Sequence, residues 1–512
     1  MCKMKWFASI GFEIHLQLAA SKKLFSGAKR GVSETPNTSI AHFDVSLPGS
    51  MPILSQEALR LAVRGALALN CNVAPVCQFD RKHYFYPDLP AGYQITQRDV
   101  PLGRNGFVQL SKHLDDVDNT IVPIQHVQLE QDTAKSIHVD SVSKTLLDFN
   151  RAGSPLLEVV TAPCLHDENT AGSFLRKIQS IMRYARVSDA KMETGGMRCD
   201  VNVSIAPIIS TPSESSKDFT VGLELPKTEL KNLSSVRNVM NAIRYEVHRQ
   251  ISLAEKNEIW ATETRGFDDK TGQTFLLRDK SISEDYLYLP ETDVPPVTIS
   301  KDYVREIANS MGPLPDDLFI MLTSKPYSMS IRDARILLNL PYGYDYYYTV
   351  RKIIGKQAGF SKEIIDDSLH ALPTWIITDL VGKLHEHEKE EDLFYVPPNQ
   401  LADIVCYCSA RKISRLTAKA LINHLIVTPS KMSVADIIKE LKLDFIQDSN
   451  TLDVQVGKIL EASPKQVREF LNGKQSLLKY FIGQVMRQVR GRGDPVEIEK
   501  LLKQRLGDTL KK

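Results

Sequence analysis

Chemically versatile side chains recur at alternate positions in short apolar segments of this chain. Glu13 and His15 alternate with Phe12, Ile14 and Leu16. A β-strand sends successive side chains to opposite faces, so Glu13 and His15 are expected to share the polar face of a strand whose other face is apolar. Further segments predict polar faces of the same kind, which hold Asp80, Lys82 and Tyr84; His126, Gln128, Glu130 and Asp132; Arg198, Asp200, Asn202 and Ser204; and Glu229 and Lys231.

These residue types point to one kind of chemistry. Several carboxylates with a histidine suit a hard divalent cation, and arginine and lysine beside them suit phosphate oxygens. A cation site with such neighbours could carry phosphoryl transfer, where positioning and charge neutralisation do most of the catalysis. The sequence contains no G-x-x-x-x-G-K-[ST] and no G-x-G-x-x-G, so a nucleotide site here would not use a common phosphate loop.

A simpler explanation exists for each polar face taken alone. An antiparallel sheet often turns one face to water, and that face is then polar without any function. Solvent-facing strands usually carry long lysine and glutamate side chains with threonine, whereas these segments mix Asp, Asn, His and Arg. The pattern by itself leaves both explanations open: a shared polar cavity and a solvated sheet surface.

The elements that must position these residues fall into two groups. The first 297 residues are rich in predicted strands, with helices expected at 55–69, 170–187 and 235–253. After Pro290, Pro295 and Pro296 the segments become helical, with short polar loops. The fold class is therefore α+β, with a β-rich N-terminal part that contains an antiparallel sheet and an all-helical C-terminal part. The strands are expected at 11–18, 78–86, 125–132, 196–205 and 221–233, and the later helices at 301–310, 331–338, 362–369, 375–385, 398–408, 414–425, 433–441, 450–462, 464–471 and 476–489.

The composition argues against a generally basic nucleic-acid-coating protein and against a chain with a transmembrane helix. The net charge is +2, so any nucleic-acid contact must come from local patches. Seven scattered cysteines suit reduced thiols in an intracellular compartment, and the sequence has no apolar run of about 18 residues that would predict membrane insertion. No full targeting peptide is visible in the first twelve residues.

The same residues carry a resemblance to a known family. Along nearly its whole length the chain is similar to the B subunits of aspartyl/glutamyl-tRNA amidotransferases. The similarity lies in residues 11–15, 47–49, 79–90, 92–95, 149–160, 197–204, 229–232, 285–288 and 483–486.

The resemblance implies an activity. Such a subunit is a carbon–nitrogen ligase, with glutamine as the amide donor. It uses ATP and Mg²⁺ to phosphorylate the glutamyl side-chain carboxylate on misacylated Glu-tRNA(Gln), and ammonia then displaces the phosphate. A partner amidase, the A subunit, supplies the ammonia, and a small third subunit joins the complex. The chain would work in the mitochondrial matrix of a fungal-like organism, or alternatively in a bacterial cytoplasm.

The resemblance also implies domains and site residues. It divides the chain into a cradle domain (1–297), a helical domain (298–445) and a helical tail (446–512) that contacts tRNA. The metal ligands would be Glu13, His15, Glu130, Asp200 and Glu229. The catalytic residues would be Lys82, Tyr84, Arg198 and Glu158, with Lys82 and Arg198 neutralising phosphoryl oxygens. The tRNA-binding residues would be Lys479, Arg487, Arg490 and Arg492, whose alternative role is an ordinary solvated surface.

Some positions depart from the family pattern. Many bacterial members have a zinc site with C-x-C after the first strand and C-x-x-C before the Leu-Pro-Gly segment. The corresponding residues here are Ser26, Ala28, Ala41 and Asp44, so no structural zinc is expected. His83 replaces a common asparagine, and Gln131 replaces a common acid that would face away from Glu130. These losses favour an organellar branch.

Two other functions remain open from the sequence. The chain could be a tRNA-binding scaffold without its own catalysis, which would bind tRNA without cleaving ATP. The acidic cluster could instead be a metal hydrolase site, which would act without any amidase partner.

Overall fold

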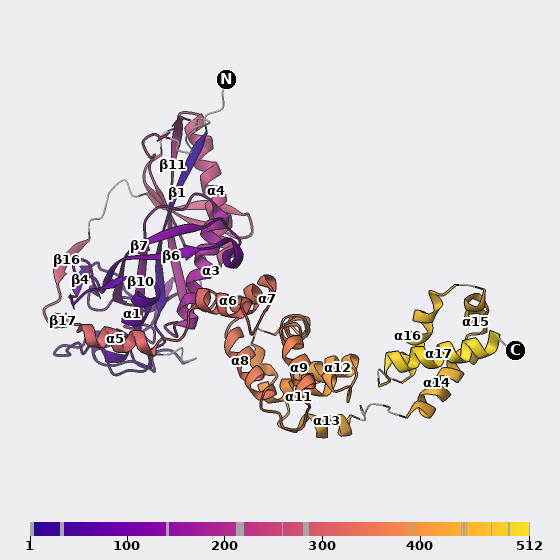
Figure 1. Cartoon of the computed structure of the whole chain (residues 1–512). Helices are drawn as coiled ribbons and strands as arrows, with labels where there is room; N and C mark the ends of the chain where they lie inside the picture. The colour runs from indigo at the N-terminus through magenta and orange to yellow at the C-terminus, as the bar shows by residue number, and fades with distance from the viewer. Residues whose placement is uncertain are drawn as a thin grey trace. The chain divides into compact units, whose positions relative to one another are not determined.

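The fold is described from a computed structural model that covers residues 5–30, 35–139, 143–210, 220–258, 260–279, 286–389, 392–441, 443, 446, 448–472, 474–489 and 492–510. The chain forms two compact units, Met1–Lys325 and Pro326–Lys512. The first unit contains the sheets and the second is helical (Figure 1). The predicted α+β class, with strands before helices, is confirmed.

A ten-stranded sheet forms the centre of the first unit. Its order is β15-β14-β13-β11-β1-β10-β7-β6-β2, and β12 pairs with β11. Neighbouring strands are antiparallel, as predicted, except for the parallel pair β13 and β14. The strands are β1 (Trp6–Gln17), β2 (Asn72–Val73), β6 (Gly103–Leu110), β7 (Thr120–Gln131), β10 (Pro155–Thr161), β11 (Met197–Ser210), β12 (Thr220–Val221), β13 (Thr228–Lys231), β14 (Glu263–Asp268) and β15 (Gln273–Asp279).

Smaller sheets hold the other strands. The segment predicted at 78–86 is not part of the large sheet, because β4 (Asp80–His83) lies between β16 (Leu287–Pro290) and β5 (Tyr93–Thr96). The two remaining pairs are β3 (Val76–Cys77) with β17 (Val297–Thr298), and β8 (Lys135–Val139) with β9 (Lys144–Asp148).

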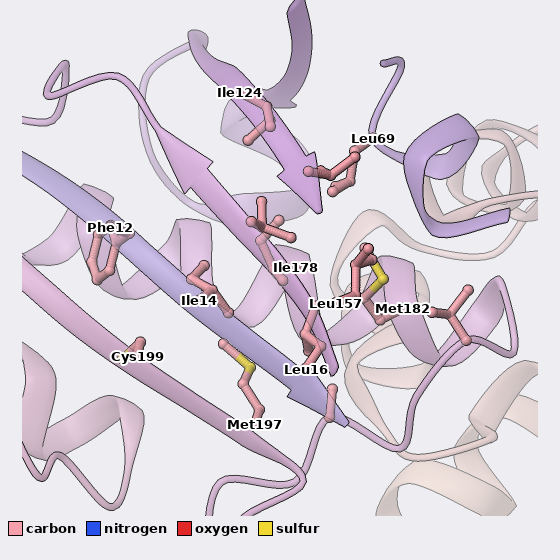
Figure 2. Close-up of a cluster of buried hydrophobic side chains, with 14 of the residues drawn as sticks. Phe12, Ile14, Leu16, Leu69, Ile124, Leu157, Ile178, Met182, Met197 and Cys199 are labelled. Atoms are coloured by element: carbon pink, nitrogen blue, oxygen red, sulfur yellow. The ribbon is translucent and has the colours of Figure 1, made fainter. Parts of the chain in front are cut away.

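One face of the large sheet is buried under helices. Phe12, Ile14 and Leu16 of β1 lie in a single apolar core with Ile178 and Met182 of α3 (Glu168–Tyr184), as Figure 2 shows. Burial of this face leaves Glu13 and His15 on the opposite side of the strand. The core also includes residues of α1 (Gln56–Ala68) and α4 (Val236–Glu255).

Each of these helices begins where the sequence offers a capping residue. The side chains of Ser55, Asp167 and Ser235 accept hydrogen bonds from backbone N–H groups in the first turns of α1, α3 and α4. Such caps satisfy N–H groups that have no partner within the helix. The helices predicted at 55–69, 170–187 and 235–253 are therefore confirmed, with small differences at their ends.

The first unit extends beyond the last strand. Helices α5 (Lys301–Ser310) and α6 (Pro315–Thr323) belong to it, and Lys177 of α3 lies 2.6 Å from Asp316 of α6 (Nζ to Oδ1). The compact unit ends after Lys325, and the predicted boundary of the cradle domain at residue 297 stays a prediction. The short helix α2 (Lys112–Asp115) and the 3-10 turn Phe43–Val45 complete this unit.

The second unit is built from helices. They are α7 (Ile331–Asn339), α8 (Gly343–Ile354), α9 (Lys362–Thr374), a π-helical turn (Trp375–Leu380), α10 (Val381–Glu386), a 3-10 turn (Leu393–Tyr395), α11 (Pro398–Ser409), α12 (Arg415–Val427), α13 (Val434–Glu440), α14 (Ser449–Ala462), α15 (Pro464–Leu471), α16 (Leu477–Gln488) and α17 (Pro495–Leu510). A separate apolar cluster joins α14, α16 and α17. The division of this unit at residue 445 stays a prediction.

Among the described residues, four α-helices were not predicted: α2, α6, α8 and α17. Helix α8 is rich in tyrosine and β-branched residues, which favour strands locally. Burial of Tyr346, Tyr347, Val350 and Ile354 at helical spacing overrides that preference. The π-turn has a local cause, because Pro373 lacks the N–H that would continue the α-helical bonding pattern of α9.

Among the described residues, none of the helices combines the length and the apolar character needed to cross a bilayer.

Candidate active site

The side of the large sheet opposite the helix-covered face gathers two groups of possible metal ligands. In each group the donor atoms lie within 4.8 Å of one another. The first group is His15, Glu130 and Glu158, and the second is Glu13, Asp200 and Glu229. Strand β1 contributes to both, because Glu13 and His15 are two residues apart on one face.

Strand order and register explain the first group. Strand β10 lies between β1 and β7 and places Glu158 opposite His15. Nδ1 of His15 lies 2.8 Å from Oε1 of Glu130 on β7, across β10. The amide of Gln128 donates to Oε2 of Glu158 at 2.6 Å, which holds this carboxylate toward the group.

The second group lies on the other side of β1. Glu13 pairs with Asp200 of β11, and Asn202 of β11 pairs with Glu229 of β13. Nζ of Lys231 lies 2.7 Å from Oδ2 of Asp200 and 3.4 Å from Oε1 of Glu229. The amide of Asn202 donates to Oε1 of Glu13 at 3.2 Å. Lysine and asparagine thus orient all three carboxylates.

The close packing of these groups shifts their pKa values. Burial alone would lower the pKa of His15, but the charge and hydrogen bond of Glu130 raise it to about 9, with smaller contributions from Glu158 and Asp200. Burial and the charge of Glu130 raise the pKa of Glu158 to about 8. Burial would also raise the pKa of Glu130, yet His15 and Lys82 hold it below its usual value. A bound cation would replace the protons that these groups share.

Cationic side chains surround the acidic face. Nη2 of Arg198 lies 2.7 Å from Oδ2 of Asp132, and the pKa of Arg198 is raised despite burial because Asp132 and other acids favour its charge. Nζ of Lys82 lies 4.8 Å from the ring centre of Tyr286 and 6.0 Å from that of Tyr84. Lys82, on strand β4 of the separate three-stranded sheet, therefore lies against two aromatic rings. It is also close enough for its charge to favour the ionised forms of Glu130 and Glu158.

The phenol of Tyr84 is held by neighbouring polar groups. Its hydroxyl donates to Oε1 of Gln94 at 3.4 Å, and Gln94 donates to the carbonyl of Gln131 at 2.5 Å. Burial, followed by the charge of Glu130, raises the pKa of Tyr84, so the phenol stays protonated. Gln131 is turned toward β5, where its Oε1 accepts from the N–H of Ile95, as expected for a side chain that faces away from Glu130.

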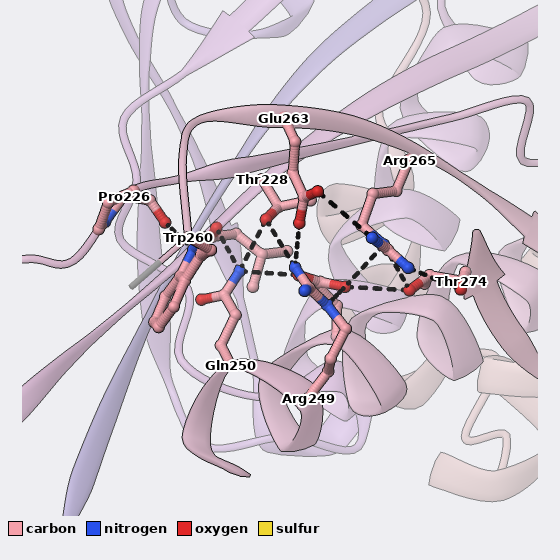
Figure 3. A network of polar contacts seen from close by, with 10 residues as sticks. Pro226, Thr228, Arg249, Gln250, Trp260, Glu263, Arg265 and Thr274 are labelled. Atoms are coloured by element: carbon pink, nitrogen blue, oxygen red, sulfur yellow. Dashed lines mark hydrogen bonds and ion pairs between the residues drawn. The ribbon is translucent and has the colours of Figure 1, made fainter. Parts of the chain in front are cut away.

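A buried polar network supports the strand that carries Glu229. Figure 3 shows Arg249 and Gln250 of α4 reaching Thr228 of β13, with Glu263 and Arg265 of β14 nearby. Glu246 is fully buried and lies 2.7 Å from Arg249 (Oε1 to Nη2). On β14, the strand next to β13, the hydroxyl of Thr264 donates to Oε2 of Glu229 at 3.0 Å. The network fixes β13 and β14, and through them the orientation of Glu229.

The structure brings together most of the predicted site residues. All five expected metal ligands, and Glu158 with them, lie in the two groups. Asp80 belongs to neither group, and its Oδ2 accepts hydrogen bonds from the N–H groups of Arg98 and Asp99. Thr264 could not be identified from the sequence, because nothing in its local pattern distinguishes it. Its role arises only from the parallel pairing of β13 with β14.

The predicted tRNA-binding residues lie in the second unit. Lys479 and Arg487 are exposed on α16, whereas Arg492 donates through Nε to the carbonyl of Val489 at 3.1 Å. Arg490 lies outside the described residues. These positions leave tRNA contact as a prediction.

The donor sets differ in the metals they suit. Carboxylate oxygens with a single imidazole suit a hard cation such as Mg²⁺, and the residues at the sheet face fit it. The positions at which the family resemblance implies zinc-binding cysteines hold Ser26, Ala28, Ala41 and Asp44, which do not form a thiolate set.

Comparison with known proteins places this chain among relatives. Residues 8–305 match the GatB/GatE catalytic domain, and residues 361–506 match the GatB domain. The chain is 40% identical over 502 residues to a protein of Schizosaccharomyces japonicus that is named as the mitochondrial B subunit of glutamyl-tRNA(Gln) amidotransferase, with 97% of each chain covered. The protein of the same name from Komagataella phaffii is 38% identical, over 97% of this chain and 98% of the relative.

A bacterial relative is similar over the same length. The B subunit of the aspartyl/glutamyl-tRNA(Asn/Gln) amidotransferase of Thermodesulfovibrio yellowstonii is 35% identical, over 98% of this chain and 99% of the relative. The resemblance noted in the sequence is confirmed. The chain therefore belongs to the GatB family of tRNA-dependent amidotransferase B subunits.

Proposed function

We propose that this chain phosphorylates the side-chain carboxylate of glutamate on misacylated Glu-tRNA(Gln) with ATP, and that it then directs ammonia to the activated carbon to give Gln-tRNA(Gln). The observation that carries the proposal is the pair of acidic groups on one sheet face, flanked by Lys82, Arg198 and Lys231. The names of the relatives supply the tRNA substrate.

The proposed reaction has two steps. A carboxylate oxygen of the glutamyl side chain attacks the γ-phosphorus of ATP, and the bond from that phosphorus to the bridging oxygen of ADP breaks. The nitrogen of ammonia then attacks the acyl carbon, inorganic phosphate leaves, and the nitrogen loses a proton. The product is the side-chain amide, and neither step requires a redox partner.

The residues of the sheet face have distinct roles in this scheme. His15, Glu130 and Glu158, with Glu13, Asp200 and Glu229, would hold Mg²⁺, which supplies charge neutralisation for the phosphates when bound. Arg198 is held in place by Asp132 and can approach phosphoryl oxygens through its other N–H groups. Lys82, whose charge acts on Glu130, would offer a point charge.

The scheme requires partners. The naming of the relatives as B subunits implies a complex of several subunits. In this proposal, ammonia would come from an amidase A subunit, and a small third subunit would complete the complex, as the family resemblance implies. The mitochondrial names of the fungal relatives favour the mitochondrial matrix, with bacterial cytoplasm as the alternative.

The direct test uses the purified complex with ATP, Mg²⁺, glutamine and Glu-tRNA(Gln). Glu13→Ala and Glu130→Ala should each lower tRNA-dependent ADP formation by more than about 100-fold while tRNA still binds. Asp302→Ala, an exposed acid on α5, is the matched control and should retain full activity. Normal ADP and Gln-tRNA formation by both site variants would refute the proposal. Bound tRNA without any tRNA-dependent ATP cleavage by the unaltered complex would make the chain a scaffold.

A further inference from the structure

A buried ion pair joins two turns near the end of β1. Nζ of Lys23 lies 2.9 Å from Oδ2 of Asp44, and the two side chains are 0% and 1% exposed. Nζ also donates to the carbonyl of Phe149 at 3.1 Å. Removing two charges from water is costly, so such a pair persists only where further hydrogen bonds compensate it.

Each member of the pair organises its own turn. The backbone N–H of Lys23 donates to the carbonyl of Ala28 at 3.0 Å, closing the turn that follows β1. Oδ2 of Asp44 also accepts from the N–H of Ala41 at 2.8 Å, and the N–H of Asp44 donates to the carbonyl of Ala41 at 3.0 Å. The ion pair is therefore a link between two independently formed turns.

These two turns contain the four positions at which the family resemblance implies zinc-binding cysteines in many relatives. Ser26 and Ala28 lie in the first turn, and Ala41 and Asp44 lie in the second. Asp44 itself stands at one of the thiolate positions. We propose that the Lys23–Asp44 ion pair replaces structural zinc in this chain, so that one carboxylate and one ammonium join the turns that a metal joins in those relatives.

The surroundings of the pair connect it to the candidate active site. The second turn lines a cavity of about 230 Å³ whose other walls include Gln131 and Asp132, the partner of Arg198. Gly153, which leads into β10, has φ +75°, and a Cβ atom there would lie 3.1 Å from Oδ1 of Asp44. The pair thus holds a wall of this cavity next to the strand that carries Glu158.

The electrostatic environment of Lys23 agrees with a role of the ion pair in joining the two turns. Burial lowers the pKa of Lys23, and the hydrogen bond and charge of Asp44 oppose that shift. Loss of the carboxylate would leave a buried ammonium without its counter-charge, and loss of the lysine would leave a buried carboxylate. Either loss should loosen the link between the turns.

The test uses the full-length chain and measures stability and metal content together. The unaltered chain should contain less than stoichiometric zinc, and EDTA should leave its Tm unchanged. Asp44→Asn and Lys23→Met should each lower Tm by about 5 °C or more and accelerate proteolytic cleavage within residues 35–50. Lys22→Met, an exposed lysine in the same turn, is the matched control and should change neither property.

Two further variants keep the test decisive if a single variant does not fold. Lys23→Met with Asp44→Leu removes both charges and should be more stable than either single variant. A chain with Ser26→Cys, Ala28→Cys, Ala41→Cys and Asp44→Cys should bind about one zinc and lose stability in EDTA. The proposal fails if the unaltered chain carries stoichiometric zinc whose removal lowers Tm. It also fails if both single variants match Lys22→Met, or if the double variant is no more stable than the singles.

Discussion

Nδ1 of His15 lies 2.8 Å from Oε1 of Glu130, although β10 separates the strands that carry them. The contact spans the width of a strand because both side chains are long enough to lean over β10 from either side. It joins an imidazole to a carboxylate at the centre of the acidic face. Glu158, which β10 carries between them, completes the group.

Glu158 offers a substitution that keeps shape and removes charge. In Glu158→Gln the new amide can still contact Gln128, so we expect the thermal stability of the chain to stay close to that of the unaltered chain. The loss of a metal ligand should lower tRNA-dependent ATP cleavage by more than about 100-fold and raise the Mg²⁺ concentration required. ADP release at varied Mg²⁺ measures both effects. Activity equal to that of the Asp302→Ala control would remove Glu158 from the site.

Thr264 is expected to act through Glu229. Thr264→Val keeps the volume but loses the hydroxyl that donates to Oε2 of Glu229. The half-saturating Mg²⁺ concentration should rise about 10- to 100-fold, as is usual when a partner of a metal ligand is lost. Thr264→Ser retains the hydroxyl and should restore the original value. Titration of Mg²⁺ against ADP formation tests this, and equal behaviour of the two variants would contradict it.

Glu246 should matter for stability more than for chemistry. Its carboxylate is fully buried and accepts hydrogen bonds from Arg249, Gln250 and Thr274. Glu246→Ala leaves these donors without their acceptor and should lower the free energy of unfolding by about 3–5 kcal/mol. Urea unfolding followed by circular dichroism measures the change. Glu255→Ala, at the exposed end of the same helix, is the control and should have little effect.

The acidic face should make the metal-free chain sensitive to alkaline pH. The pKa values of His15 and Glu158 are raised to about 9 and about 8, so the folded chain binds more protons than the unfolded chain between each ordinary pKa and the raised one. Stability from these groups is present at lower pH and is lost as pH rises through about 8 to 9. Unfolding curves in EDTA at pH 6 to 9.5 test the trend. Glu158→Gln should flatten it, and a rise in stability over this range would contradict the assigned shifts.

The exposed lysine and arginine of α16 test the predicted contact with tRNA. If Lys479 and Arg487 each contact a phosphate, Lys479→Ala and Arg487→Ala should weaken binding and reduce the salt dependence of the association constant. The slope of log K against log salt should fall by about 0.7–0.9 for each lost contact. Filter binding of tRNA by the complex at several salt concentrations gives the slope. Gln488→Ala on the same helix is the uncharged control, and an unchanged slope in both variants would assign these residues to an ordinary solvated surface.

Local alternation was enough to predict much of the candidate site. The strand pattern placed Glu13 and His15 on one face, and the structure buries Phe12, Ile14 and Leu16 on the other. Alternation did not predict that the carboxylate of Asp80, on the equally regular strand β4, would bind the backbone N–H groups of Arg98 and Asp99. Alternation tells which side chains share a face of one strand, but it does not tell which sheet the strand joins.

Local sequence patterns also did not predict where the first compact unit ends. The prolines near residue 297 mark the end of the strands, yet α5 and α6 remain with the sheet. Contacts such as Lys177 with Asp316 decide this, and they join residues that are far apart in the sequence.

The sequence by itself determined the residue types of the acidic face, the α+β order of elements and membership of the GatB family. The tertiary structure decided how six ligands divide into two groups, since that depends on the order β13-β11-β1-β10-β7 and on the register of each pair. It also decided that Thr264 orients Glu229 and that Lys23 meets Asp44. Such contacts depend on distances across strands and turns, which side-chain alternation along one segment does not encode.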